Sequence, residues 1–567
     1  MTTEPEQVIK SLIDNAEEVP ASTDSGAMPG PAKGKPTQAD TLIKMAKAAE
    51  LFHTPDGLGF ADICIGNHRQ TYALKSSGFN HWLRHRYYEA TGSAPSENAM
   101  ADAMRTLEAN AQFASPERVV HMRIAEFDNR VYLDLADEAG RVVEIDRRGW
   151  RIVDDPPVRF RRPPGMRSLP LPQRDGSIDR LREFVNVQSD HEFVLAVSWL
   201  LASLRASSAY PVLVISGEQG TAKSTLSGVL RSLVDPNAVP LRALPREARD
   251  LHIAANNGHV LAFDNVSHLS SWLSDTFCQL ATGGGFTTRA LYTDDEEKMF
   301  NASRPILLNG IVDVVERPDL ADRSIFLKLP PISAANRRPK DELDAAFAAA
   351  SPEILGALLD GVVEGLRQLP EVRMDGLPRM AEFAKWATAC ETAFWPAGKF
   401  MSAYDHNRRG AVEQILDIDL VGDAVRTLIW RESEWHGTAS ELLTALGEIV
   451  GERTTKSRAW PSTTQALSTR LQRATTFLRS GGIEIAQARE GKNRTRMIHI
   501  SERTEASTRI AANDDVLPAD DHSPASLNVD EPKVSDQIGA ITADEADDDL
   551  RTGPDATFDI AKMAERL

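Results

Sequence analysis

The spacing of hydrophobic residues changes several times along the chain and divides it into segments. Helical spacing in TLIKMAKAAELF and FNHWLRHRYYEA predicts helices within residues 38–113. The short apolar runs VVHMRIAEF, VYLDL, VVEI and GWRIV follow, separated by the turn sequences DN and DEAG, and they predict strands. Residues 38–158 are therefore expected to form an N-terminal α+β domain.

The middle of the chain shows a second kind of pattern. The stretch RFRRPPGMRSLPLP at residues 159–172 is rich in Arg and Pro and cannot form a helix. We interpret residues 159–189 as a linker that ends in the entry helix SIDRLREFV. Across residues 190–335, short apolar strands alternate with helical stretches, which predicts an α/β sheet with helices on both faces.

The C-terminal part returns to helical spacing and then ends without any pattern. Residues 340–400 predict helix throughout, within a helical domain at 336–419. Residues 420–501 predict helices followed by the strands IEIAQAR and RTRMIHI, which suggests a winged-helix-like domain. The segments 1–37 and 502–567 lack periodicity and predict disorder.

The distribution of charge modifies this picture more than the net charge of −18 does. Residues 502–567 contain 17 acidic and 6 basic residues, whereas residues 452–500 contain 10 basic and 3 acidic ones. An acidic tail therefore follows a basic segment that could contact nucleic acid.

Cysteine usage and hydropathy favour a cytoplasmic protein without a membrane partner. The three cysteines are scattered, which argues against a disulfide framework or a zinc site and is typical of a reducing compartment. The longest apolar run, FVLAVSWLLASL, is shorter than the roughly 20 residues that span a bilayer. The N-terminus shows no basic and apolar signal pattern.

The sequence GEQGTAKST lies between the strand-like PVLVIS and the helix-like LSGVLRSLV. In a phosphate-binding loop, backbone N–H groups at a helix N-terminus point at the phosphates. Gly217 and Gly220 are expected to permit the turn. Lys223 is expected to reach the β- and γ-phosphates of ATP, and Ser224 to hold Mg²⁺.

Ala222 stands where the second glycine of this motif belongs. It costs little if its φ is negative, and about 1 kcal/mol or more if its φ is positive. The residues predicted to surround the phosphates are Gly217, Glu218, Gln219, Gly220, Thr221, Ala222, Lys223, Ser224 and Thr225.

Polar residues follow the next predicted strands in the order that nucleotide chemistry requires. Asp264 ends the run VLAF, where a ligand for Mg²⁺ or its water is needed. Asn309 ends ILLN and could orient an attacking water. Arg317 and Arg323, in RPDLADRSIFLKL, could each act on the γ-phosphate of a neighbouring subunit.

The order GEQGTAKS, LAFDN, ILLN and DLADR resembles the AAA+ ATPases of helicase superfamily 3, and above all the primase–helicase-like proteins of phages, plasmids and other mobile elements. The resemblance covers residues 190–335 and implies a P-loop NTPase (AAA+-like) core in a hexameric ring, with ATP held between subunits. It also implies a P-loop Lys223 and Ser224, a Walker B Asp264, a sensor 1 Asn309 and an arginine finger Arg323.

Two features depart from that family pattern. Asn265 follows Asp264, where many AAA+ enzymes have a glutamate that polarises the attacking water. Either Glu218 or Asp275 substitutes for it, or hydrolysis is slow. A hairpin is expected at residues 281–300, but its tip TDDEE is acidic. DNA contact would then fall to its flanking residues Arg289, Tyr292 and Lys298; the alternative is a solvated acidic turn.

The segment from Trp460 predicts a helix and a basic wing, a geometry that docks on DNA. The alternative is a winged helix that contacts protein and has solvated charges. The candidate nucleic-acid residues here are Arg470, Arg473, Arg479, Lys492, Arg494 and Arg496.

The N-terminal region shows no convincing second active site. Asp134 and Asp137 faintly resemble a metal pair, but their spacing does not place both on one strand face, and a turn explains them better. The cluster HWLRHRYYEA is expected to belong to an amphipathic helix.

Two functions remain open on this evidence. The first is a ring-forming ATPase that unwinds or remodels DNA for a phage- or plasmid-type element. The second is a nucleotide-dependent switch that binds DNA or protein, with slow or no hydrolysis.

Overall fold

The computed structural model describes most of the chain between residues 36 and 502. The described residues are 36–66, 68–206, 209–284, 303–311, 314–315, 317–374, 376–457, 460–490 and 495–502, with the backbone of 286–289 and 297–300. The two terminal segments that the sequence predicts to be disordered lie outside these residues, apart from their innermost positions.

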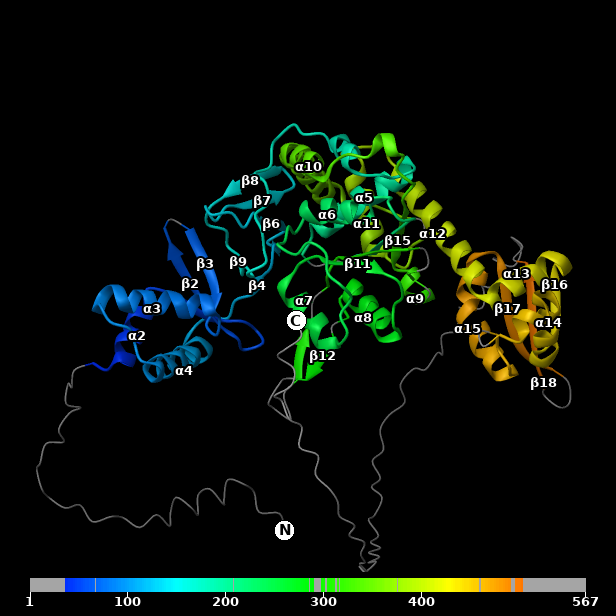
Figure 1. Cartoon of the computed structure of the whole chain (residues 1–567), viewed down its shortest axis with the longest axis horizontal. Helices are drawn as coiled ribbons and strands as arrows, with labels where there is room; N and C mark the ends of the chain where they lie inside the picture. Colours follow the sequence, from blue (N-terminus) through cyan, green and yellow to red (C-terminus); the bar gives the residue numbers. More distant parts are fainter. Residues whose placement is uncertain are drawn as a thin grey trace, which may run out of the picture. The chain divides into compact units, whose positions relative to one another are not determined.

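Helices make up much of the described chain (Figure 1). The α-helices are α2 (Gln38–Ala46), α3 (Ser77–Thr91), α4 (Glu97–Ala114), α5 (Asp190–Ser203), α6 (Lys223–Ser232), α7 (Ala248–Asn257), α8 (Ser271–Thr282), α9 (Pro318–Ala321), α10 (Lys340–Gln368), α11 (Ala381–Glu391), α12 (Lys399–Ile418), α13 (Leu420–Glu432), α14 (Ala439–Thr455) and α15 (Thr464–Ser480). The 3₁₀ helices are η1 (Ile178–Phe184) and η2 (Ala334–Asn336).

The strands form several separate sheets. They are β1 (Glu50–His53), β2 (Gly59–Ile65), β3 (His68–Ala73), β4 (Val120–His121), β5 (Ile124–Phe127), β6 (Arg130–Asp134), β7 (Val142–Asp146), β8 (Gly149–Val153), β9 (Arg159–Phe160), β10 (Val212–Ser216), β11 (Leu261–Val266), β12 (Phe286–Arg289), β13 (Glu297–Phe300), β14 (Ile306–Gly310), β15 (Ser324–Lys328), β16 (Glu434–Thr438), β17 (Ile483–Glu490) and β18 (Thr495–Glu502).

The first described region combines helices with a sheet that the sequence pattern did not predict. Strands β1, β2 and β3 form an antiparallel sheet, and helices α2, α3 and α4 share a separate core with it. Helix α3 is amphipathic as expected, with Phe79, Leu83 and Tyr87 buried. The prediction of helices alone within 38–113 was therefore incomplete, because four consecutive residues of β2 are buried and hide the alternation that marks a strand.

A second antiparallel sheet, β5-β6-β7-β8, follows in the expected order. The predicted first strand VVHMRIAEF is broken at Arg123, whose φ is +63°. The fully buried Arg123 side chain donates to Asp235 (Nε–Oδ1 3.1 Å) and to the backbone oxygen of Asp134 (2.9 Å). Apolar residues between Ile124 and Trp150 share a core with the central region, so no break in the core coincides with the predicted boundary at residue 158.

Asp134 and Asp137 form ion pairs with arginines in or near this sheet. Asp134 is buried and pairs with Arg162 (2.5 Å), while Asp137 pairs with Arg141 (2.6 Å). No group of three or more metal-ligating side chains occurs among the described residues. Both carboxylates also accept from turn amides, Asp134 Oδ1 from Ala136 N and Asp137 Oδ1 from Arg141 N, each at 2.9 Å.

The predicted linker is anchored to the structure at several points. Within it, Arg167 N donates to Pro236 O, and Gln173 N donates to Pro352 O, both at 2.9 Å. A Cβ on Gly356 would lie 1.7 Å from Gln173 O, so this close approach requires glycine.

The central sheet is parallel, with strand order β11-β14-β10-β15. Alternate residues of β10 enter different cores: Leu213 and Ile215 join one cluster, and Val212 and Val214 join the other. Figure 1 shows α5, α10 and α11 on one side of this sheet and α7 and α8 on the other. The α/β architecture with both faces covered is confirmed.

Helix α10 runs for 29 residues but does not continue to residue 400, as the pattern had suggested. The chain leaves helical conformation after Leu369, in a stretch that contains Pro370, Gly376 and Pro378, and α11 then begins. Helix α10 is also long and apolar enough to cross a membrane. However, 61% of its most apolar window is buried inside the structure, which is typical of a core helix.

The C-terminal described region has the element order α13, β16, α14, α15, β17, β18. Its antiparallel sheet has the order β16-β18-β17, and β17 and β18 pair along eight residues from Ile483 to Glu490. The predicted strand pair after the helices is confirmed, and β16 is an additional strand that the sequence did not suggest.

Candidate functional site

The loop after β10, which we call the phosphate loop for its predicted role, turns on two glycines and leads directly into a helix. Gly217 has a φ of +152° and Gly220 a φ of +83°, both in the region that favours glycine. Helix α6 begins at Lys223, directly after the loop. The backbone amides at this helix N-terminus are therefore available to bind an anion.

Ala222 is the N-cap residue of α6 and adopts φ +64° and ψ +30°. Of the two alternatives that the sequence left open, the positive φ is the one observed. A methyl group in this conformation costs about 1 kcal/mol relative to glycine, and the fold tolerates it.

The Lys223 ammonium group lies over its own loop. Its Nζ donates to Gly217 O (2.8 Å) and Glu218 O (2.7 Å), and Thr221 Oγ1 also donates to Glu218 O (3.0 Å). The loop carbonyl oxygens thus surround the ammonium group of Lys223. An anion bound in the loop would compete with these oxygens for the ammonium group.

Ser224 and Asp264 meet although 40 positions separate them in the sequence. Ser224 Oγ donates to Asp264 Oδ1 at 2.9 Å, which joins the first turn of α6 to the end of β11. A hydroxyl and a carboxylate side by side are oxygen donors of the kind that Mg²⁺ prefers. These two side chains therefore fit the predicted Mg²⁺ site beside the loop.

Asn309 lies at the same edge of the sheet and is 1% exposed. Its Oδ1 accepts from Asn265 N (3.0 Å), and its Nδ2 donates to Ser227 Oγ (2.9 Å). It therefore holds the end of β11 against α6. Asn265 is exposed with a φ of +55°, and its backbone N also donates to Asp264 Oδ1 (2.9 Å).

Helix α6 and strand β11 are also joined at their far ends. Asp235, just after α6, accepts hydrogen bonds from His259 N (2.9 Å) and Val260 N (3.1 Å), just before β11. Burial, together with the nearby Arg304 cation, lowers the pKa of the His259 imidazole to about 4. This buried frame fixes how α6 and β11 lie relative to each other.

A cavity of about 900 Å³ opens beside the phosphate loop, a size suited to a nucleotide. Its other two walls come from segments before α5 and after β15, which no local sequence pattern connects to the loop. The lining residues are Glu183, Phe184, Val185, Asn186, Gln219, Gly220, Ala222, Thr225, Leu226, Pro331, Ile332, Ser333, Asn336, Arg337, Arg338 and Leu343.

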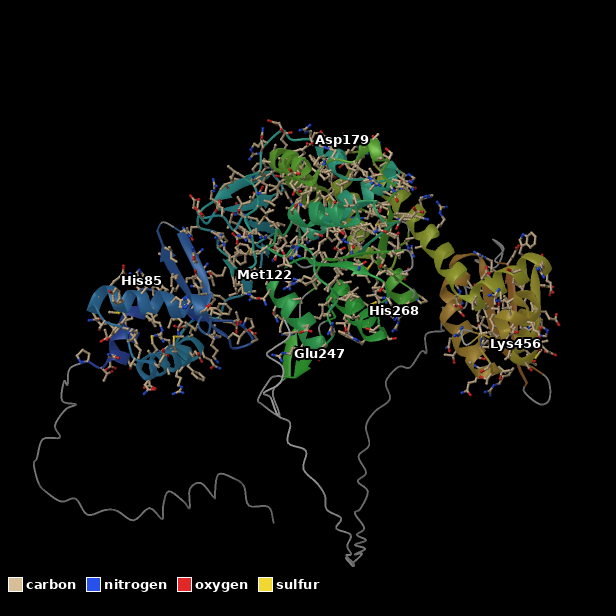
Figure 2. The ribbon with its side chains drawn as sticks, viewed as in Figure 1. His85, Met122, Asp179, Glu247, His268 and Lys456 are labelled. Carbon is tan, nitrogen blue, oxygen red and sulfur yellow. The ribbon has the colours of Figure 1, made fainter. Side chains whose placement is uncertain are left out.

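The two arginines considered for action in trans are both paired within the chain. The Arg323 side chain is 10% exposed and forms an ion pair with Asp319, whose backbone oxygen it also contacts (2.8 Å). Arg317 pairs with Asp275 at 2.7 Å, so the carboxylate of Asp275 is engaged as well. Glu218 stays exposed in the loop. His268, labelled in Figure 2, lies in the segment between β11 and α8.

The predicted hairpin between the Asp264 and Asn309 strands is present. Strands β12 and β13 pair antiparallel, with Arg289 opposite Glu297. The greater part of the acidic tip lies outside the described residues, as do Tyr292 and the side chains of Arg289 and Lys298.

The C-terminal basic candidates differ in how far their charges are available. Arg479 pairs with Glu484 at 2.8 Å, and Arg470 is half-buried. Arg496 is exposed and lies directly opposite Arg489 on β17, a residue that was not among the predicted candidates. Only the strand register reveals that pair. Lys492, Arg494 and the side chain of Arg473 lie outside the described residues.

Comparisons with known proteins agree with the origin that the motifs suggest. Residues 178–407 match the model of the actinomycete integrative conjugative element replication protein, and residues 421–513 match the RepA C-terminal domain of the same elements. No curated protein sequence matches the chain significantly.

Two solved structures are similar at low identity. The A-form apo structure of the NrS-1 C-terminal region is 12% identical, with a TM-score of 0.37 over 81% of this chain and 98% of that chain. A second structure, of NrS-1 residues 305–718, is 13% identical, with a TM-score of 0.36 and the same coverage. The family matches, which together span more than half of the sequence, show that this chain carries both domains of a conjugative-element replication protein.

Proposed function

We propose that the chain binds ATP with Mg²⁺ at the loop of residues 217–225 and hydrolyses it to act on DNA during replication of the element. The observation that carries this proposal is the contact between Ser224 Oγ and Asp264 Oδ1 at 2.9 Å. It joins a glycine-containing loop at a helix N-terminus to an acidic strand end, which is what a metal-bound triphosphate needs.

In this proposal each side chain has a separate task. Lys223 leaves its loop carbonyls to bind the phosphates, and Ser224 with Asp264 would hold Mg²⁺. The metal ion neutralises charge on the β- and γ-phosphates when it is bound. Asn309 keeps Asp264 and α6 in register through Asn265 and Ser227. The AAA+-like interpretation of the core and a hexameric ring belong to the same proposal.

DNA contact is proposed for the C-terminal region, interpreted as a winged helix. Its order of three helices and three strands, with β17 and β18 as the wing, supports that interpretation. Arg489 and Arg496 lie directly opposite each other, and like charges in that position destabilise a strand pair. A DNA phosphate near both would relieve the repulsion.

A second function, a nucleotide-dependent switch with slow hydrolysis, is favoured by two observations. Asn265 places an amide after Asp264, and an amide cannot accept a proton from the attacking water. Arg323 is buried in its pair with Asp319 and would have to break that pair to reach another subunit.

The rate of ATP turnover, with and without single-stranded DNA, separates the two functions. The enzyme hypothesis expects turnover that DNA stimulates and that the substitution Lys223→Ala abolishes. Tight MgATP binding with no turnover, unchanged by DNA, would refute the enzyme and leave the switch.

A further inference from the structure

The cavity beside the phosphate loop is built by three segments that are far apart in the sequence. Asn186 joins them: its Nδ2 donates to Thr221 O in the loop (3.1 Å) and to Pro330 O after β15 (2.8 Å). The wall at residues 331–338 is thus held next to the loop by a side chain from the entry segment. A molecule in the cavity would touch all three segments at once.

The cavity has an apolar portion and a cationic one. Phe184, Leu226 and Leu343 supply apolar surface, and Phe184 is buried with its ring 5.2 Å from that of Phe347. This portion suits the flat, apolar faces of a nucleotide base. It lies next to the first turn of α6, on the side of Thr225 and Leu226.

The cationic portion is formed by Arg337, with Arg338 beside it. Arg337 Nη2 lies 3.8 Å from the position that a Cβ would occupy on Gly220, so the guanidinium reaches the phosphate loop itself. Both arginines are exposed, and neither has an acidic partner among the residues that the structure describes. The one acidic side chain in the lining, Glu183, already accepts from Arg180 (2.6 Å).

We infer that Arg337 binds the phosphate chain of the nucleotide from within the same subunit, while the apolar portion takes the base. This inference rests on the proposed function and deepens it, because it adds a cation that no loop motif contains. A guanidinium presents a planar fork of donors that matches phosphate oxygens, and an unpaired cation beside Gly220 has nothing else to neutralise it. Arg337 is a binding residue in this account.

The test compares three ligands on four versions of the full chain. Calorimetry measures MgATP and MgADP, and ligand-detected NMR measures adenosine, for wild type, Arg337→Ala, Arg337→Lys and Arg249→Ala. Arg249 is an exposed arginine on α7 outside the cavity lining, so its loss controls for net charge.

We expect Arg337→Ala to weaken MgATP and MgADP by roughly 10- to 100-fold, the range for charge-assisted hydrogen bonds, and to leave adenosine unchanged. Arg337→Lys should retain part of the lost affinity, and Arg249→Ala should bind like wild type.

The outcomes separate this inference from the proposal beneath it. If wild type binds MgATP and Arg337→Ala binds it equally well, the inference is overturned and the ATP site stands. An equal loss for adenosine and ATP would also overturn it, because Arg337 would then only shape the cavity wall. A wild-type chain that binds no MgATP removes the proposed function and this inference with it.

Discussion

The sheet edge that carries Asp264 and Asn309 and the basic hairpin of the C-terminal region use charge in opposite ways. In the first region, Asn309 at the sheet edge and Asp235 at the far ends of α6 and β11 are both buried, and both have hydrogen-bond partners. At the second, Arg489 and Arg496 are exposed and face each other without an opposite charge between them in the strand register. The stability of the first region should therefore be sensitive to the loss of a single partner. DNA binding by the second region should be sensitive to the salt concentration.

Removing one buried partner is expected to have the largest effect on the free energy of unfolding. Asp235→Ala leaves the fully buried Arg123 unpaired and frees two backbone amides, and we expect it to lower the free energy of unfolding by about 3–5 kcal/mol. Urea unfolding followed by circular dichroism measures the change.

The matched control is an exposed pair elsewhere in the chain. Asp423 pairs with Arg426 at 2.8 Å, and both side chains are more than a third exposed. Asp423→Ala should change stability by less than about 1 kcal/mol. Equal effects of the two substitutions would show that the buried Asp235 contributes no more to the free energy of unfolding than an exposed pair does.

The stability of the buried region around Asp235 and His259 should also depend on pH. Because the pKa of His259 is about 4 in the folded chain and near its ordinary 6.5 when unfolded, the unfolded state binds the extra proton between these values. Stability is fully present above pH 6.5 and falls as the pH drops toward 4, by about 1–3 kcal/mol from this group.

Urea midpoints at pH 7.5 and pH 5 measure that loss. His259→Gln keeps a hydrogen-bonding side chain without the titration, so its stability should depend less steeply on pH in this interval. An unchanged slope would mean that His259 does not titrate as its burial implies.

The salt dependence of DNA binding tests the two exposed arginines, Arg489 and Arg496. Arg489→Ala and Arg496→Ala should each weaken DNA binding by about 1 kcal/mol and reduce the slope of log K against log salt by about 1. Arg479→Ala is the control from the same domain, because Glu484 already neutralises that arginine. Fluorescence anisotropy at several salt concentrations measures all three, and an equal effect of Arg479→Ala would contradict the assignment.

The smallest predicted effect concerns backbone strain in the loop. Ala222→Gly should stabilise the chain by about 1 kcal/mol, because glycine adopts φ +64° without penalty. The same substitution at the exposed Ala349, inside α10, should destabilise it by about 1 kcal/mol. Thermal unfolding of both variants checks the signs, and a loss at Ala222 would contradict the strain.

The sequence was informative wherever adjacent residues carry the signal. The glycines and Lys223 of the loop are contiguous, and Asp264 and Asn309 each end a recognisable apolar strand, so their meeting at one sheet edge could be predicted. The positive φ of Ala222 could not, because alanine ordinarily disfavours that conformation and only the geometry of the loop imposes it.

Features that depend on distant segments were not predictable. The cavity walls come from residues near 185 and 335, and no local pattern connects them. The Arg489–Arg496 pair depends on strand register, which two arginines in separate strands do not reveal. The sheet β1-β2-β3 was missed because four consecutive residues of β2 are buried, so its sequence shows no alternation.

Titration calorimetry on the full chain shows whether the loop from Gly217 to Thr225 binds MgATP. We expect saturable heat with ATP and Mg²⁺, its loss when EDTA removes the metal, and at least about 100-fold weaker binding by Lys223→Ala. Wild-type protein that releases no magnesium-dependent heat, or a Lys223→Ala variant that binds MgATP as tightly as wild type, would contradict MgATP binding at this loop.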